Sequence, residues 1–177
     1  MTSHIVRAFS IAALAFTAAC ASGGARSSAA PAQRDRLGFD LDGKPWKRVS
    51  QQGAGSTTLT EFVRPDESLA RWHEMLTMQT FERGAASPVD AQAALRAQML
   101  ERCPGATWQA LQQDSSSVLY EWRIAGCAGQ EDQHEVARII DSPRIRMRVA
   151  YTYKGGAMPD SVRESWVSRL GAASWEQ

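Results

Sequence analysis

Apolar and polar residues alternate most regularly between Arg144 and Tyr153, where almost every second position is apolar. Successive side chains of a strand point to opposite faces, so this alternation predicts a strand with one buried face. The run from Val118 to Ile124 follows the same rule, and its apolar residues should face a core. Both segments are therefore predicted strands of one sheet.

Short polar turns join these strands to other runs of β-forming residues, which predicts hairpins. Trp46 to Gln51 and Thr57 to Val63 flank a turn rich in glycine. The predicted partners of the two regular strands are Trp108 to Gln112 and Gln133 to Ile140. The chain thus contains at least three predicted hairpin connections.

Three other segments carry apolar residues at three- and four-residue intervals, which predicts amphipathic helices. Ala91 to Arg102 has the clearest start, because Ser87 and Asp90 before it form a capping-box pattern. The other two predicted helices are Pro159 to Leu170 and Glu67 to Leu76. The residues that follow the latter, Thr77 to Phe81, fit a strand as well as they fit a continued helix. This order of elements predicts an α+β fold, a mostly antiparallel sheet of about five to seven strands with two or three helices packed on one face.

The N-terminal segment has a different pattern, a polar start with His4 and Arg7 and then an apolar stretch from Ala8 to Ala19. That stretch is too short to span a bilayer comfortably and has the layout of an export signal. The residues from Ala21 to Arg36 lack large apolar side chains, which is typical of a flexible tether. We expect residues 1–19 to be a signal peptide, residues 20–36 a lipidated cysteine with its tether, and residues 37–177 a single α+β domain.

The end of the apolar stretch, Phe16-Thr17-Ala18-Ala19-Cys20, resembles the lipobox of bacterial lipoproteins, although Thr17 stands where Leu is usual. The resemblance implies that Cys20 is acylated, becomes the first residue after cleavage and makes the membrane a partner through its lipid anchor. Ala21 in place of the Asp used for inner-membrane retention implies the outer membrane, facing the periplasm, in a Gram-negative cell. The alternatives are ordinary cleavage after an alanine, which gives a soluble periplasmic protein, and a retained membrane anchor.

Two cysteines remain in the predicted domain, Cys103 and Cys127. In an oxidising periplasm an even pair predicts a disulfide, which would stabilise the domain by roughly 3 to 4 kcal/mol through loop-closure entropy. Two buried free thiols are the alternative. We expect no metal site, because no histidine or cysteine cluster supports either residue.

Charge patterning offers one candidate anion-binding site. The formal net charge of +1 gives no broad positive field, so we expect no nucleic-acid partner. Arg144, Arg146 and Arg148 should nevertheless share one face of the last strand, where they are spaced to hold a phosphate or polyanion. The alternative, which we favour, is a solvated outer face whose arginines pair with Glu135 and Asp141.

Aromatic residues offer a second candidate, an apolar pocket between the helices and the sheet. Its predicted lining is Trp72, Trp122, Tyr151 and Trp166. Core packing is the simpler interpretation of Trp72. The segment from Glu61 to Gln79 also resembles stretches of uncharacterised proteobacterial secreted proteins, a resemblance that implies no activity.

Catalytic patterns are missing from the sequence. His73 and His134 are the histidines outside the signal segment, and neither belongs to a recognisable nucleophile, phosphate-loop or zinc motif. We therefore expect a non-catalytic cell-envelope lipoprotein without a cofactor that binds a protein, lipid or cell-wall component. The alternatives are a small-ligand carrier with an apolar pocket and an envelope hydrolase.

Overall fold

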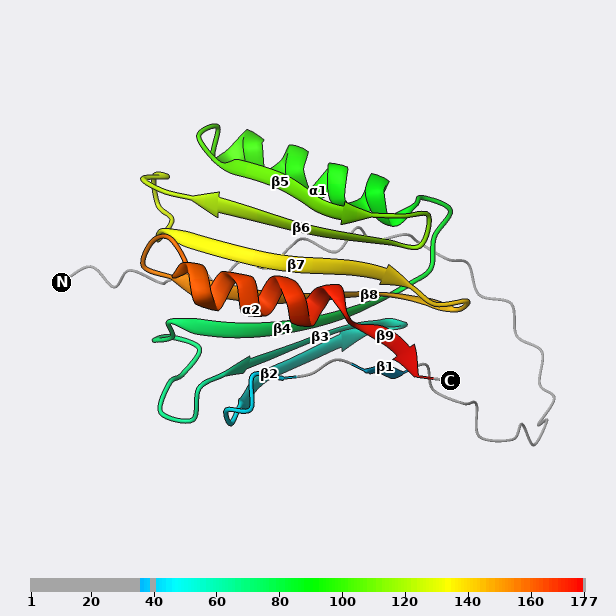
Figure 1. The fold of residues 1–177 in the computed structure, drawn as a ribbon, viewed down its shortest axis with the longest axis horizontal. Coiled ribbons are helices and arrows are strands. Elements are labelled where there is room, and N and C mark those ends of the chain that lie inside the picture. The colour runs from blue at the N-terminus through cyan, green and yellow to red at the C-terminus, as the bar shows by residue number, and fades with distance from the viewer. Residues whose placement is uncertain (1–35, 39–40, 177) are drawn as a thin grey trace. The chain divides into compact units, whose positions relative to one another are not determined.

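The computed structural model describes residues 36–38 and 41–176. The predicted signal peptide, Cys20 and nearly all of the predicted tether lie outside the described residues. Within them, seven strands form one antiparallel sheet in the spatial order β2-β3-β4-β8-β7-β6-β5 (Figure 1). The strands are β2 (Lys47–Ala54), β3 (Thr57–Val63), β4 (Glu74–Glu82), β5 (Thr107–Gln113), β6 (Ser117–Ile124), β7 (Gln133–Asp141) and β8 (Ile145–Lys154).

A second, two-stranded sheet joins the two ends of the described chain. Strand β1 (Arg36–Gly38) pairs antiparallel with β9 (Ser174–Glu176), and Leu37 lies opposite Trp175. The indole N–H of Trp175 donates a hydrogen bond of 2.9 Å to the carbonyl of Asp141 at the end of β7. The short sheet is therefore fastened to the large one.

Helix α1 (Pro88–Arg102) carries the chain from β4, inside the sheet, to β5 at its edge. Its predicted capping box is confirmed: the Ser87 hydroxyl accepts the backbone N–H of Asp90 at 3.1 Å, and the Asp90 carboxylate accepts the backbone N–H of Ser87 at 3.0 Å. These bonds satisfy donors that every helix start leaves open. Three successive hairpins then return the chain to β8, beside β4.

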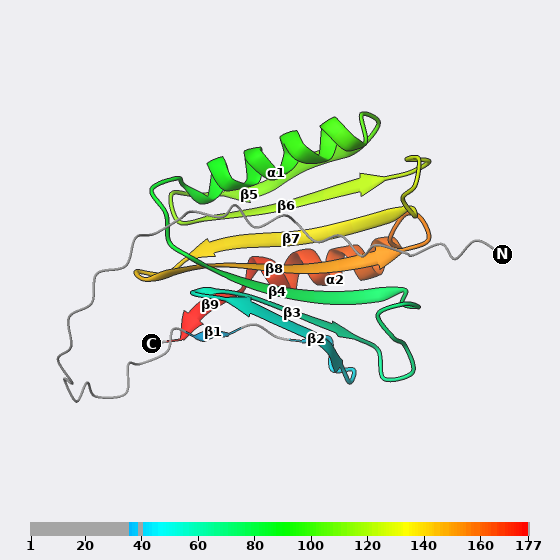
Figure 2. The ribbon, with the colours of Figure 1, turned by 180° about the vertical axis from the view of Figure 1, so that it is seen from behind.

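The two helices lie on opposite faces of the sheet, which corrects the prediction of helices on one face (Figures 1 and 2). On one face, Leu95 and Met99 of α1 pack against the apolar residues of β6 such as Tyr120. On the other, Trp166 and Leu170 of helix α2 (Asp160–Gly171) pack against residues that alternate with these along the strands. Strands buried on both faces need an apolar cover on each side, and one helix serves each face.

The predicted helix from Glu67 to Leu76 is wrong. Residues 67–73 form turns, and Glu74 begins β4. The Glu67 side chain accepts the backbone N–H groups of His73 at 2.8 Å and of Arg64 at 3.4 Å, bonds that fasten the loop in a non-helical form. Pairing of β4 with both β3 and β8 then outweighs the weak helical spacing of its apolar residues.

Arg138 fixes the C-terminal end of α2 to the sheet. One of its guanidinium nitrogens, Nη1, donates to the carbonyls of Leu170, Gly171 and Ala173 at 2.9, 2.6 and 2.9 Å. A cation at this position also complements the negative end of the helix dipole. Arg138 therefore points to the α2 face and takes no part in the row formed by Arg146 and Arg148.

Candidate functional site

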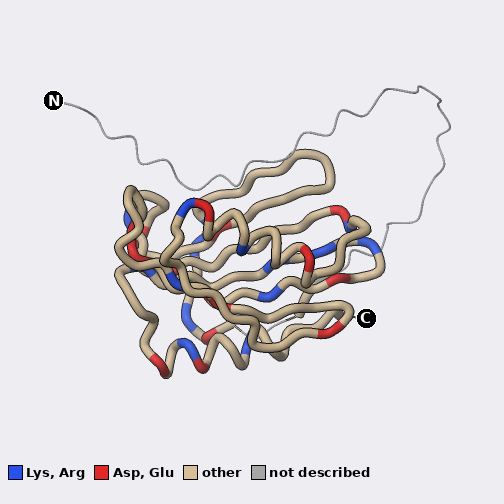
Figure 3. The backbone as a smooth tube through the Cα atoms, turned by 90° about the horizontal axis from the view of Figure 1, so that it is seen from above, with Lys and Arg blue, Asp and Glu red and all other residues tan. Residues whose placement is uncertain are grey.

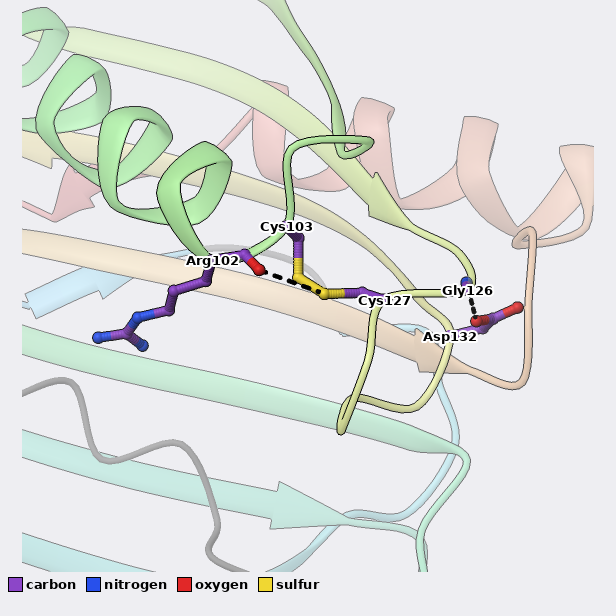
Figure 4. The surroundings of a disulfide bond; sticks show 5 residues. All are labelled: Arg102, Cys103, Gly126, Cys127 and Asp132. Atoms are coloured by element: carbon purple, nitrogen blue, oxygen red, sulfur yellow. Dashed lines mark hydrogen bonds between the residues drawn. A yellow bond between two sulfur atoms is a disulfide. The ribbon is translucent and has the colours of Figure 1, made fainter.

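Cys103 and Cys127 form a disulfide, the pairing that the sequence predicts (Figure 4). Their Cα atoms lie 5.6 Å apart, and the bond joins the end of α1 to the loop between β6 and β7. In the same loop, the Asp132 carboxylate accepts the backbone N–H of Gly126 at 2.8 Å. Cys103 is buried in the α1-side core, so this bond holds α1 on the sheet.

Two residues of the arginine row, Arg146 and Arg148, are buried at 7% and 8% exposure and so do not form a solvated outer face. Arg146 donates two hydrogen bonds, of 2.6 and 2.9 Å, to the Asp141 carboxylate. Arg148 pairs with Glu135 and donates to the Tyr120 hydroxyl at 2.9 Å. The pairings with Asp141 and Glu135 are as expected, and they neutralise both guanidinium groups. Arg144 lies exposed before the start of β8.

The four predicted pocket residues are not brought together. Tyr151 and Trp166 stack on the α2 face with ring centroids 4.3 Å apart, inside a filled core. Trp122 lies on the opposite face, where its indole N–H donates to Glu135 at 2.6 Å. Trp72 lies in the loop before β4 and packs under the Lys154 ammonium, 4.9 Å from the ring centroid. These aromatic residues therefore serve packing on three separate parts of the domain.

A cluster around Arg64 was missed from the sequence. Its guanidinium lies 3.8 Å over the Trp46 ring and forms ion pairs with Asp42 and Glu74. Burial alone would raise the pKa of Asp42, but hydrogen bonds from Arg64 and from the backbone of Lys44 outweigh it, so the pKa is lowered. The cluster binds the segment before β2 to the sheet, and its charges are already matched.

The two histidines occupy different surroundings. His73 is exposed and its Nδ1 lies 3.1 Å from the Glu67 carboxylate. His134 is half-buried on β7: its Nδ1 accepts the backbone N–H of Met158 at 3.1 Å, so the proton sits on Nε2, 3.5 Å from Glu121. Burial lowers the pKa of His134, which keeps the ring neutral near pH 7. Both ring nitrogens of His134 are therefore engaged within the protein.

Beside His134 lies a shallow hollow of about 210 Å³ where β5, β6 and β7 meet. On the α2 face, Thr107, Arg123 and His134 line up across the three strands, and Gln109 lies opposite Glu121 in the next row. Trp108 and Trp122 also border the hollow. The hollow opens next to the outermost strand, so its rim is formed by the sheet edge.

Glu121 is the acid of this hollow, and it is already matched. Arg163 of α2 donates to it twice, at 2.6 and 2.7 Å. Burial alone would raise the pKa of Glu121, but Arg163 outweighs it and the pKa is lowered. Arg123, in contrast, is exposed, and no ion pair to it occurs among residues 41–176. Acidic and basic residues are interspersed along the backbone (Figure 3).

Strand β5 is the sheet edge next to this hollow. It pairs with β6 on one side, and its sequence, Thr-Trp-Gln-Ala-Leu-Gln-Gln, has no charged residue or proline. A register shift between Ala110 and Gln112 leaves Thr107 to Ala110 as the regular part of this edge. In the described part of the chain the buried indole N–H of Trp108 has no acceptor. An uncharged edge of this kind is a template for pairing with another strand.

The opposite edge of the sheet, strand β2, carries charged residues. Strand β2 begins with Lys47 and Arg48, and its pairing with β3 shifts register between Arg48 and Ser50. The Lys47 ammonium donates to the carbonyls of Pro65 and Glu67 at 2.8 and 2.7 Å. Charged residues are a common means of blocking edge-to-edge pairing. Both edges have a register shift, so the charges at the start of β2 are what distinguish it from β5.

Among residues 36–38 and 41–176, no group of three or more His, Cys, Asp or Glu side chains is placed to hold a metal ion. The same residues include no helix with the length and apolarity needed to cross a membrane. Comparisons with protein-family models, curated proteins and solved structures gave no match to this chain.

The sequence contained one usable signal for the β5 edge. Seven consecutive strand residues without a charge stand out in a chain of which 22% is charged. Strand order, however, is not visible in sequence, so the same segment was equally compatible with the middle of the sheet. The exposed Arg123 was hidden for a similar reason, since its position beside the edge depends on the pairing of β5 with β6.

Proposed function

We propose that this protein is a cell-envelope lipoprotein, held at the outer membrane by Cys20, whose domain binds an extended segment of an envelope protein along β5. The observation that carries the proposal is the free, uncharged edge of β5 beside the hollow. In this binding mode the partner adds a strand, main-chain hydrogen bonds supply affinity, and adjacent depressions supply specificity.

The proposed function involves no catalysis. General acid–base chemistry needs a titratable group that can reach a substrate proton. His134 has both ring nitrogens engaged, and Glu121 accepts two hydrogen bonds from Arg163. These contacts support a domain that recognises a partner and leaves it chemically unchanged.

Proline substitutions along β5 test the binding mode. Of two consecutive edge residues, one directs its N–H to β6 and the next directs it outward. Gln109→Pro and Ala110→Pro should therefore differ. One of the two removes a hydrogen bond to β6 and lowers stability, and the other removes only an outward N–H that the partner strand needs. The variant that keeps its melting temperature should bind the partner with at least one hydrogen bond fewer, worth about 1 kcal/mol or roughly fivefold in Kd.

The binding assay uses peptides selected from a displayed library of random octapeptides on the oxidised domain, followed by hydrogen exchange with the peptide bound. Slower exchange confined to Thr107–Gln113 supports strand addition. The matched control is Gln51→Pro and Gln52→Pro on β2, which should leave peptide affinity unchanged. Peptides that protect β2 instead, or no selectable peptide at all, would overturn the proposal.

The lipid anchor is tested separately by intact-mass spectrometry of membranes from cells that express the full chain. A diacyl or triacyl mass on a chain beginning at Cys20 supports the anchor. A chain of unmodified mass in the soluble periplasmic fraction refutes it. Reduction and alkylation of the same sample should reveal two thiols, those of Cys103 and Cys127.

A further inference from the structure

The lining of the hollow beside β5 includes one guanidinium group, that of Arg123, and one carboxylate, that of Glu121. The Glu121 carboxylate already has a partner outside the lining, Arg163 of α2. Arg163 is bound to this carboxylate through two hydrogen bonds, and the neighbouring His134 is neutral near pH 7. The exposed guanidinium of Arg123 is therefore the unmatched charge of the hollow.

The position of Arg123 suits a ligand on a strand added to β5. Arg123 lies directly opposite Thr107, on the face that carries α2. Neighbouring strands are about 4.8 Å apart, so a partner strand beyond β5 would lie roughly 10 Å from β6. Thr107 is short, and the long Arg123 side chain can extend across it toward the next strand. A carboxylate on the partner's side chain would close the remaining distance.

We propose that the segment bound at β5 is acidic at one position: an Asp or Glu side chain lies opposite Thr107, enters the hollow and pairs with Arg123. This inference rests on the proposed strand addition and names the chemistry of its partner. Guanidinium and carboxylate groups form directional, charge-assisted hydrogen bonds, so the pair would also fix the register of the added strand. A basic residue at the same position would face Arg123 and be rejected.

The other charges near the hollow leave this conclusion unchanged. Asp160, Arg163 and Glu164 of α2 all lie outside the lining of the hollow, and the two acids act on Arg163. The exposed His73 lies in the loop between β3 and β4 and is likewise absent from its lining. The β2 edge offers no equivalent site, because its Lys47 ammonium is bound to two carbonyls.

The test is a comparison of octapeptide libraries selected on three forms of the oxidised domain. The unmodified domain should enrich Asp or Glu at one position of the peptides. Arg123→Gln should abolish that enrichment, and Arg123→Glu should replace it with Lys or Arg. Arg96→Gln, at an exposed arginine of α1, is the matched control and should retain the acidic preference.

Affinities then measure the pair directly. Replacing the selected Glu by Gln in a synthetic peptide should weaken binding to the unmodified domain about two- to fivefold, and less at high salt. The same replacement should leave binding to Arg123→Gln unchanged. Peptides that protect β5 from exchange but show no acidic preference would overturn this inference and leave strand addition intact. Failure to select any peptide would overturn both.

Discussion

The two faces of the central strands are stabilised by different chemistry. On the α2 side, Tyr151 stacks on Trp166, and Trp46 meets both rings edge-on, with ring centroids 6.3 and 6.2 Å away. On the α1 side, a buried ion pair joins Arg148 to Glu135 beneath the apolar residues of β6. We call the α2 side the aromatic face, because its stability depends on how closely these rings pack. We call the α1 side the ionic face, because its stability depends on each buried charge having its partner.

This difference bears on where the protein can bind a ligand. Stacked aromatic side chains fill the core between α2 and the central strands, and on the other face the buried Arg148 is paired with Glu135. Because the central strands are covered on both sides, we place the proposed recognition site at the edge of the sheet. The four predictions that follow separate the two faces by the size and pH dependence of their contributions to stability.

The aromatic face should give the largest effect. Trp166 is 2% exposed, and truncating it to alanine removes both its burial and its contacts with Tyr151 and Trp46. We expect Trp166→Ala to lower the free energy of unfolding, measured by urea titration, by about 5 kcal/mol, the upper end of the range for such truncations. Trp72→Ala, at a half-buried ring beside Lys154, is the control and should cost about 1 kcal/mol. Equal losses for both would contradict a core centred on Trp166.

The ionic face should be nearly as sensitive to loss of one partner and far less sensitive to loss of both. Arg148→Met leaves the Glu135 carboxylate buried without its cation, which should cost about 3–5 kcal/mol. The double variant Glu135→Met with Arg148→Met should recover most of that loss, because a buried ion pair is often replaceable by apolar residues. Additive losses in this double-mutant cycle would show that the two residues act independently.

The disulfide should have the next largest effect. Bond Cys103–Cys127 closes a loop across 24 positions and holds α1 against β6. Replacing both cysteines by serine should lower the free energy of unfolding by roughly 3 kcal/mol through the freedom gained by the unfolded chain. Reducing agent should reproduce this loss in the unmodified protein and have no effect on the variant. A reductant effect on the variant would point to another cause.

Local signals predicted much of this fold. The capping box at Ser87, the alternation through Tyr151 and the pairing of Cys103 with Cys127 each depend on neighbouring residues or on composition, and each is present in the structure. The mostly antiparallel sheet follows from the same hairpin signals.

Long-range arrangement was not predictable in the same way. Alternation in β8 shows that Arg146 and Arg148 share a face, but it cannot show that α1 and a network of acids cover that face. The predicted helix ending at Leu76 failed because two neighbouring strands decide the conformation of β4. The candidate site at Thr107 was missed for the same reason, since an edge exists only once the strand order is known.

The smallest expected effect concerns pH and involves His134, which links β7 to the segment before α2. Burial lowers the pKa of His134 below its ordinary value of 6.5, so the unfolded chain binds more protons than the folded protein just below that pH. Stability should therefore fall as pH is lowered from about 7 through 6.5 and stop falling once the folded-state pKa is passed. Asp42 and Glu121 have lowered pKa values, and their losses begin only near 4.5 and below.

Urea titrations in a series of buffers at half-unit steps between pH 7.5 and 5 measure this dependence of stability on pH. His134→Gln keeps an acceptor for the Met158 N–H and removes the titrating ring, so its stability should be nearly flat over the same range. His73→Gln, at the exposed histidine, is the matched control and should retain the slope of the unmodified protein. If His73→Gln flattened the curve instead, the pH-sensitive contact would lie in the loop before β4 and His134 would be uninvolved.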